Sequence, residues 1–309
     1  MCSLFGMIDY GQSLSGKKKS RMLSALAKEC EERGTDATGI AYNHNGTLRI
    51  YKRPLPARKM NFKIPDDASV IMGHTRLTTQ GSARKAANNH PFFGSVSEQT
   101  FALAHNGVLY NDVLLRRTLD LPKTKIETDS YVAVQLIEAE GSLTFESLKT
   151  MAELVMGSFC FTVLNDSDEM YLIKGNNPLC LYHFPRLKLF LYASTETILR
   201  RAISRMKESL GVPKKVDLGC GDILKIDAAG NLTWDIFSAE HLLFGWGRQH
   251  WTSTEYTPAS TRKGFEEAYI DDLKTAARYC GYDSSLVDTW LKSGFTVEEI
   301  EEFLYCGEI

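Results

Sequence analysis

The second residue of the chain is a cysteine, and this position gives it two groups that can act together. Removal of Met1 would leave the Cys2 thiol and a free α-amine on one residue. The thiolate is the reactive nucleophile, and its formation needs a base. The α-amine has a reference pKa of about 7.7 to 8.0 and the thiol one of about 8.5, so the amine can take the thiol proton near neutral pH. Cys2 is therefore a candidate nucleophile with its own base, whereas a retained Met1 would block this chemistry.

Cys2 alone is weak evidence, because a small residue often opens a strand, but polar motifs follow it along the chain. They are Arg33-Gly34-Thr35-Asp36, Gly73-His74-Thr75-Arg76-Leu77-Thr78-Thr79-Gln80-Gly81, Asn89-His90-Pro91, His105-Asn106-Gly107 and Glu127-Thr128-Asp129. In these motifs and in their order the chain resembles the class II glutamine amidotransferases, the family with an N-terminal nucleophile. The resemblance implies a four-layer αββα sandwich.

The resemblance also implies a mechanism. Cys2 would attack the side-chain amide of glutamine, ammonia would leave, and water would hydrolyse the γ-glutamyl thioester to glutamate. Asn106 and Gly107 match the segment whose side-chain amide and backbone N–H form the oxyanion hole. Such donors stabilise the negative oxygen of the tetrahedral intermediate.

The remaining site residues implied by the resemblance bind the ends of glutamine. Arg76 suits the α-carboxylate, because a guanidinium binds a carboxylate in a bidentate way, and Asp129 suits the α-ammonium group. Thr79 and Gln80 match further residues of the glutamine pocket, although the family often has His at position 80 and an aromatic residue at Leu77. No cofactor and no metal is implied.

Each of these residues also has a structural interpretation. Arg76 could form an ion pair, Asp129 could cap the helix that follows it, and Asn106 could be a turn residue. Arg33, Gly34 and Asp36 are expected to shape a loop over the N-terminus rather than to react. We expect His90 to be a buried, hydrogen-bonded histidine outside the catalytic set.

The elements that must position these residues follow from hydrophobic periodicity. Ser3–Ile8 is expected to be a strand, and 17–33 carries a helical apolar stripe. Strand pairs are expected at 37–43 with 47–53, 158–164 with 170–174, 179–183 with 188–193, and 222–227 with 231–236, the first joined by an Asn45-Gly46 turn. Helices are expected at 129–139, 144–156 and 195–210. Antiparallel strand pairs with interspersed helices indicate an α+β fold.

Composition excludes several other classes. The net charge is −2, with 36 basic and 38 acidic residues, so nucleic acid is not expected as the primary ligand. No apolar run approaches the roughly 20 residues of a membrane span, and no phosphate-binding glycine motif occurs. The seven cysteines include no C-x-x-C pair and suggest free thiols in a cytoplasmic protein.

Three segments are expected along the chain. Residues 2–245 would form the amidotransferase domain, 246–263 a linker rich in Gly, Ser, Thr and Trp, and 264–309 an acidic helical tail. Residues 261–309 hold five basic and eleven acidic residues. Helices at 265–280, 284–292 and 297–305 would make a small three-helix module, which serves either as a packing or oligomer contact or as a protein-docking module.

We expect the ammonia acceptor on a separate synthase subunit, because the tail is too short for a synthase domain. Two other functions stay open. A related N-terminal nucleophile hydrolase could cleave another γ-glutamyl amide, and a non-catalytic interaction module could retain Met1. The oligomeric state and the partner's identity do not follow from the sequence.

Overall fold

The computed structural model describes residues 2–97, 99–207, 209–243, 270, 273–274, 277–278, 282–295 and 300. The chain divides into two compact units, Met1–Gly247 and Arg248–Ile309. The predicted linker 246–263 and most of the predicted helices 265–280 and 297–305 lie outside the described residues. The helix predicted at 284–292 is confirmed as α8 (Ser285–Lys292), with Val287 buried.

The first unit contains two antiparallel sheets. The seven-stranded sheet, here sheet A, has the order β11-β9-β10-β1-β4-β2-β3. Its strands are β1 (Ser3–Asp9), β2 (Ala37–His44), β3 (Thr47–Arg53), β4 (Val70–Arg76), β9 (Cys180–Phe184), β10 (Leu189–Ala193) and β11 (Lys214–Val216). The six-stranded sheet, sheet B, has the order β13-β12-β8-β7-β6-β5. Its strands are β5 (Phe92–Val96), β6 (Gln99–Leu109), β7 (Gly157–Asn165), β8 (Met170–Lys174), β12 (Asp222–Ile226) and β13 (Leu232–Ile236).

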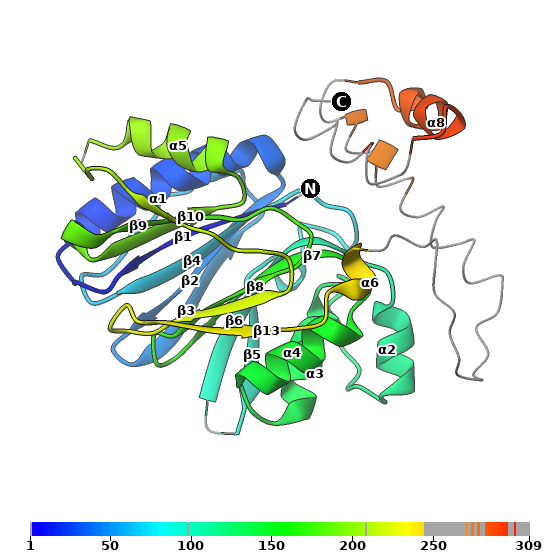
Figure 1. Ribbon diagram of the computed structural model, residues 1–309, viewed down its shortest axis with the longest axis horizontal. Helices are drawn as coiled ribbons and strands as arrows, with labels where there is room; N and C mark the ends of the chain where they lie inside the picture. The colour runs from blue at the N-terminus through cyan, green and yellow to red at the C-terminus, as the bar shows by residue number, and fades with distance from the viewer. Residues whose placement is uncertain are drawn as a thin grey trace. The chain divides into compact units, whose positions relative to one another are not determined.

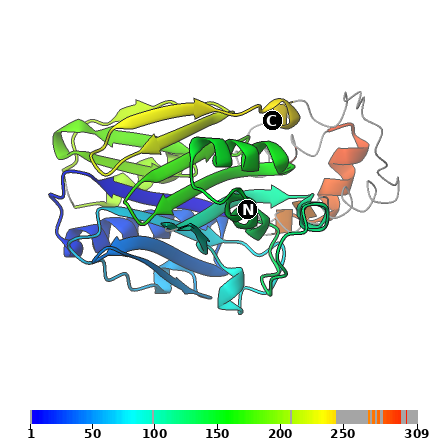
Figure 2. The same ribbon diagram turned by 90° about the horizontal axis from the view of Figure 1, so that it is seen from below.

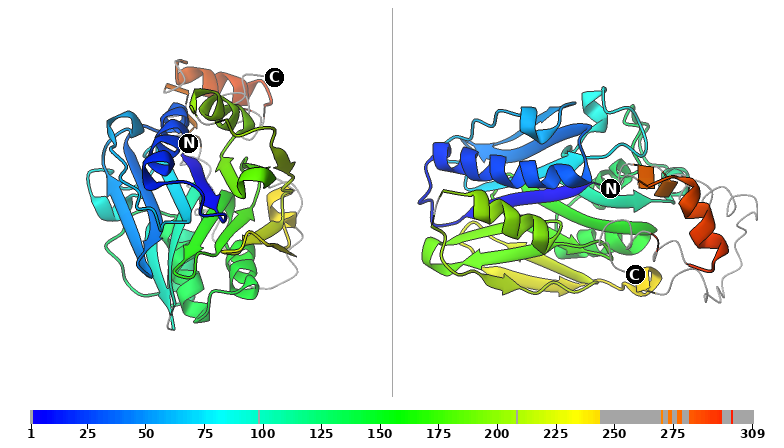
Figure 3. Two further views of the ribbon diagram at one scale, coloured as in Figure 1. Left: turned by 90° about the vertical axis from the view of Figure 1, so that its left-hand side faces the viewer. Right: turned by 90° about the horizontal axis from the view of Figure 1, so that it is seen from above.

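Helices cover the outer faces of both sheets (Figure 1). The α-helices of this unit are α1 (Gly16–Cys30), α2 (Asp112–Thr118), α3 (Tyr131–Glu140), α4 (Phe145–Leu154), α5 (Glu196–Arg205) and α6 (Glu240–Leu243). Helices α1 and α5 lie side by side on sheet A, as Figure 3 shows, and α3 and α4 lie on sheet B (Figure 2). The predicted four-layer αββα sandwich is confirmed.

Three apolar clusters fill the spaces between neighbouring layers of the sandwich. One joins α1 and α5 to sheet A, with Leu23 and Leu199 fully buried. A second joins α3 and α4 to sheet B, and a third fills the space between the sheets. Strand β1 is buried at all seven positions because a helix covers one of its faces and sheet B the other. Among the described residues no helix is both long and apolar enough to cross a membrane.

The local predictions are confirmed for the four strand pairs and for most helices. Asn45 and Gly46 both have positive φ, 51° and 67°, as the tight turn between β2 and β3 requires. The helix predicted at 195–210 is too long, since α5 ends at Arg205 and the next residue, Met206, is extended. Helix α2 was not predicted, because seven residues give too short a periodic pattern.

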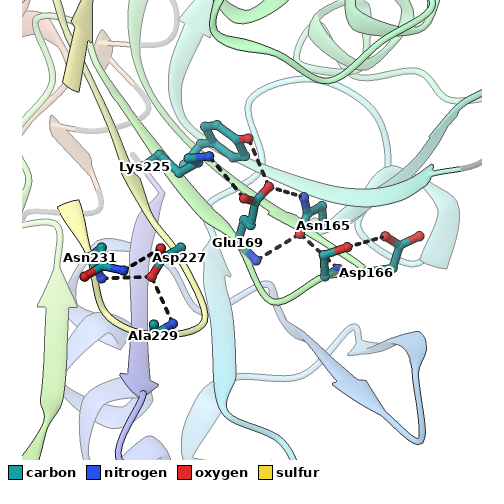
Figure 4. Close-up of polar contacts among 9 residues, drawn as sticks. Asn165, Asp166, Glu169, Lys225, Asp227, Ala229 and Asn231 are labelled. Carbon is teal, nitrogen blue, oxygen red and sulfur yellow. Dashed lines mark hydrogen bonds and ion pairs between the residues drawn. The ribbon is translucent and has the colours of Figure 1, made fainter. Parts of the chain in front are cut away.

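Two hairpin turns of sheet B are fixed by different polar contacts (Figure 4). In the turn between β7 and β8, the fully buried Asn165 accepts from the backbone N–H groups of Ser167 and Glu169 at 3.0 and 2.9 Å, and its Nδ2 donates to the Glu169 carboxylate at 2.8 Å. In the turn between β12 and β13, the exposed Asn231 donates to Asp227 at 2.9 Å. One asparagine is therefore shielded from water and the other is not.

We expect Asn165→Ala to lower the free energy of unfolding by about 1–3 kcal/mol, because it removes three hydrogen bonds made by a fully buried side chain. Asn231→Ala is the matched control, and we expect it to change stability by less than about 0.5 kcal/mol because water replaces the lost contact. Urea denaturation of both variants measures the difference. Equal losses would contradict the prediction.

Candidate active site

Cys2 lies directly before β1, at the end of the sandwich where β4 finishes. The antiparallel register of β1 and β4 places Ser3 opposite Thr75. Cys2 and Arg76 are the next residues beyond this pair, one on each strand's side, and so lie next to each other. The Cys2 Sγ donates to the Leu77 carbonyl at 3.6 Å, and the residue is 9% exposed. Strand pairing therefore brings the predicted nucleophile, Cys2, beside Arg76, the residue predicted to bind the α-carboxylate of glutamine.

Three residues of the loop before β2 hold the backbone around this pair. The Arg33 Nε donates to the Cys2 carbonyl at 3.2 Å, and the Asp36 carboxylate accepts from the Thr78 N–H at 2.7 Å. A Cβ at Gly34 would lie 2.5 Å from the Arg76 backbone at the end of β4. The loop can therefore approach β4 this closely only if residue 34 is glycine. These contacts are structural, in line with the expected role of the segment.

Cys2, Arg76 and Asp129 influence one another electrostatically. Burial raises the pKa of the Cys2 thiol, the Arg76 guanidinium lowers it, and the Asp129 carboxylate raises it. Burial lowers the pKa of Arg76, while the negative charges of Cys2 and Asp129 oppose that shift. The structure thus gathers three predicted site residues from separate elements. Because the buried thiol resists ionisation, a base close to the sulfur is needed.

The Arg76 guanidinium donates hydrogen bonds to neutral oxygen atoms. Its Nη1 donates to Asn89 Oδ1 at 2.7 Å, and its Nη2 donates to the Gly81 carbonyl at 3.0 Å and to the Gln80 carbonyl. None of these hydrogen-bond partners is a carboxylate, although the carboxylates of Asp129, Asp36 and Glu127 interact electrostatically with Arg76. Thr79 and Gln80 are exposed on the same loop, and their pocket roles stay a prediction.

Asn106 and Gly107 lie on β6, in the part of that strand beyond its pairing with β5, which ends at Leu103. Asn106 is fully buried, and neither its Nδ2 nor its Oδ1 has a hydrogen-bond partner among the described residues. A buried amide without partners costs stability, so folding alone does not explain it, and the oxyanion role of Asn106 stays a prediction. The interpretation of Asn106 as a turn residue is wrong, because Asn106 lies within β6.

Gly107 has a conformation that other residues rarely adopt. Its φ is 141°, and a Cβ built there would lie 1.9 Å from the Ser158 carbonyl oxygen. Both facts require glycine at this position. The close backbone packing orients the segment that follows Asn106.

Asp129 precedes α3 and contacts the same strand. Its Oδ2 accepts from the Leu109 N–H at 2.7 Å, and its Oδ1 accepts from the Ser130 hydroxyl at 3.3 Å. The helix cap is Ser130 and forms no side-chain capping bond, so the interpretation of Asp129 as the cap is wrong. Burial raises the pKa of Asp129, while these hydrogen bonds and Arg76 oppose the shift and favour the carboxylate.

Three buried histidines, His74, His90 and His105, pack against one another. His74 Nε2 donates to the His105 carbonyl at 2.9 Å, and burial lowers the pKa of both rings to about 3. His90 packs against His74 with ring centroids 4.2 Å apart and the ring planes tilted by 36°. The expectation that His90 would be hydrogen-bonded is wrong, since neither ring nitrogen has a partner in the described part of the chain.

Two polar neighbours of the site were not predicted. Asn89, the partner of Arg76, precedes the His90-Pro91 pair and could have been suspected from that motif. Asn177 donates to the Asn106 carbonyl at 2.8 Å, yet it sits in a Gly-Asn-Asn-Pro sequence that reads as an ordinary turn. Only the tertiary structure connects it to the site.

Comparisons with known proteins identify the kind of domain. Residues 74–201 match the family model of a glutamine amidotransferase domain. Glutamine–fructose-6-phosphate aminotransferase (isomerizing) of Staphylococcus epidermidis is 31% identical over 188 residues, which cover 58% of this chain and 30% of the relative. The protein of the same name from Lactococcus lactis is 30% identical over 191 residues, covering 59% and 30%. The match therefore spans less than a third of these relatives.

A solved structure shows the same fold. Glutamine phosphoribosylpyrophosphate amidotransferase from B. subtilis superposes with a TM-score of 0.61 at 20% identity, over 77% of this chain and 49% of that chain. Together with the family model and the sequence relatives, this confirms the resemblance found in the ordered motifs. Residues 74–201 thus form a glutamine amidotransferase domain, and the chain resembles the class II, or N-terminal nucleophile, enzymes of this kind in its motifs, its sequence relatives and its fold.

Proposed function

We propose that the protein hydrolyses L-glutamine to glutamate and ammonia with Cys2 as the nucleophile. The observation that carries this proposal is the register of β1 and β4, which sets Cys2 beside Arg76, together with the Asp129 carboxylate, whose charge acts on both. A nucleophile lies there beside a cation and an anion that suit the two charged ends of one amino acid.

The reaction proceeds in two halves. After removal of Met1, the α-amine of Cys2 takes the thiol proton, and the sulfur attacks the side-chain amide carbon of glutamine. The oxyanion accepts hydrogen bonds from the Asn106 amide and the Gly107 N–H. The C–N bond breaks, the nitrogen takes up the proton, and ammonia leaves. Water then cleaves the γ-glutamyl thioester and releases glutamate, so one water is consumed for each glutamine.

We propose that the ammonia passes to an acceptor on a separate synthase subunit. The two sequence relatives named above are aminotransferases, and the region shared with this chain covers only 30% of their length. The acceptor chemistry of those proteins thus has ample room outside the shared region. Glutamine and the synthase subunit are the two partners proposed for this chain.

The direct test uses purified protein whose intact mass shows that Met1 has been removed. Incubation with glutamine should release glutamate and ammonia in equal amounts, while γ-glutamyl peptides should react far more slowly. Faster cleavage of the peptides would favour hydrolysis of a different γ-glutamyl amide. Absence of reaction with both would refute the proposed function.

Arg76→Ala should raise the KM for glutamine by about 10²-fold or more, since a charge-assisted bidentate contact is lost. The carboxylate is held in the ground state and the transition state alike, so kcat should change much less. Steady-state kinetics with glutamine measure both values. An unchanged KM would show that another group binds the carboxylate. Arg58→Ala, which removes an exposed guanidinium paired with Glu31, is the control and should leave both values as they are.

A further inference from the structure

Asn177 lies in the loop between β8 and β9, and its side chain contacts the strand that carries Asn106 and Gly107. The Asn177 Nδ2 donates to the Asn106 carbonyl at 2.8 Å and lies 3.4 Å from the Ser158 hydroxyl. Asn177 is 5% exposed, so water competes little for this contact. A loop residue far along the chain thereby holds the backbone of the proposed oxyanion hole.

The loop itself is held firmly against β7. Beyond the last pair of β7 and β8, the Asn176 Oδ1 accepts from the Phe159 N–H at 3.0 Å, and the Asn177 N–H donates to the Phe159 carbonyl at 3.2 Å. A Cβ at Gly175 would lie 2.4 Å from the same carbonyl oxygen, so the loop can approach this closely only with glycine there. The backbone position of Asn177 is therefore held by its own main-chain bond to Phe159 and by the close approach at Gly175, independently of the bond that its side chain makes.

The bond from Asn177 determines which way the next N–H points. The Asn106 carbonyl and the Gly107 N–H belong to one planar trans peptide, in which the two groups point in opposite directions. Holding the carbonyl toward Asn177 turns the Gly107 N–H to the other side of the strand. A hydrogen bond accepted by the carbonyl also polarises the peptide and strengthens the N–H as a donor.

We infer that Asn177 is a positioning residue, which directs the Gly107 N–H at the oxyanion through its bond to the Asn106 carbonyl. The inference rests on the proposed function. It assigns the β8–β9 loop a role in the rate of the reaction and none in binding of glutamine. Because Asn177 contacts the peptide and not the reacting atoms, its effect should be smaller than the loss of a donor.

The test compares kcat, KM and thermal midpoint for two variants of adjacent residues. Asn177→Ala should lower kcat about 10-fold with KM unchanged, less than the 10²- to 10³-fold expected for removal of an oxyanion donor. Asn177→Asp keeps the size of the side chain but places a carboxylate against the Asn106 carbonyl, and should lower kcat at least as much. Asn176→Ala is the control, because it removes the contact with the Phe159 N–H and leaves Asn177 in place. It should lower the thermal midpoint and change kcat less than 2-fold.

The results separate the possible failures. A wild-type kcat in both Asn177 variants would overturn the inference, and so would a rise in KM alone. Equal losses of kcat in the Asn176 and Asn177 variants that follow their thermal midpoints would reduce Asn177 to a structural residue and overturn it as well. A wild-type protein that releases no ammonia from glutamine would instead refute the proposed function, before any variant is compared.

Discussion

Cys2→Ala is expected to abolish glutamine hydrolysis, with a loss on the order of 10⁴-fold or more, while the fold stays intact. No thioester can form without the sulfur. The substitution should cost little stability, because the hydrogen bond from the thiol to the Leu77 carbonyl is long, at 3.6 Å. Covalent labelling by 6-diazo-5-oxo-norleucine, followed by intact mass, should detect one adduct on the wild type and none on the variant.

Cys180→Ala is the matched control. Cys180 is also a buried free thiol, and burial raises its pKa to about 11, so it should not react. This variant should keep both activity and labelling. Protein with Met1 retained should be as inactive as Cys2→Ala, because its amine at residue 2 would be part of a peptide bond. Equal labelling of Cys2→Ala would disprove the assignment of the nucleophile.

Asn106→Ala should lower kcat by about 10² to 10³-fold with little change in KM, because the amide acts on charge that develops only in the transition state. The stability of the Asn106→Ala variant should not fall with its activity. Since neither polar atom of the Asn106 side chain has a partner among the described residues, its removal should leave the thermal midpoint unchanged or higher. An activity loss without a stability loss is the signature of a preorganised catalytic group.

Asn111→Ala provides the reverse pattern. Its side chain donates to the Leu154 carbonyl and accepts from the Met156 N–H, both at 2.9 Å, and so ties α2 to the end of α4. This variant should lose stability and keep kcat. Steady-state kinetics and thermal denaturation of both variants measure the contrast. A lower thermal midpoint for Asn106→Ala, with kcat unchanged, would show that Asn106 is structural.

The elements of the sandwich were largely predictable because their signals are local. Alternating apolar residues and turn sequences such as Asn45-Gly46 predict hairpins, and each hairpin needs contacts only within its own segment. The errors occur where local signals are weak. Helix α5 ends at Arg205 although the chain stays compatible with a helix beyond it, and α2 is too short to show a period.

The sequence alone determined which groups are available for chemistry at this site: a thiol next to an amine at Cys2, a guanidinium at Arg76, a carboxylate at Asp129 and an amide at Asn106. These properties belong to the residue type and need no fold. Only the tertiary structure decided that Cys2 meets Arg76 across β1 and β4, that the Asn106 amide is buried without partners, and that Asn177 holds the Asn106 carbonyl. Each of these depends on strand register and burial, which arise from contacts between residues far apart along the chain.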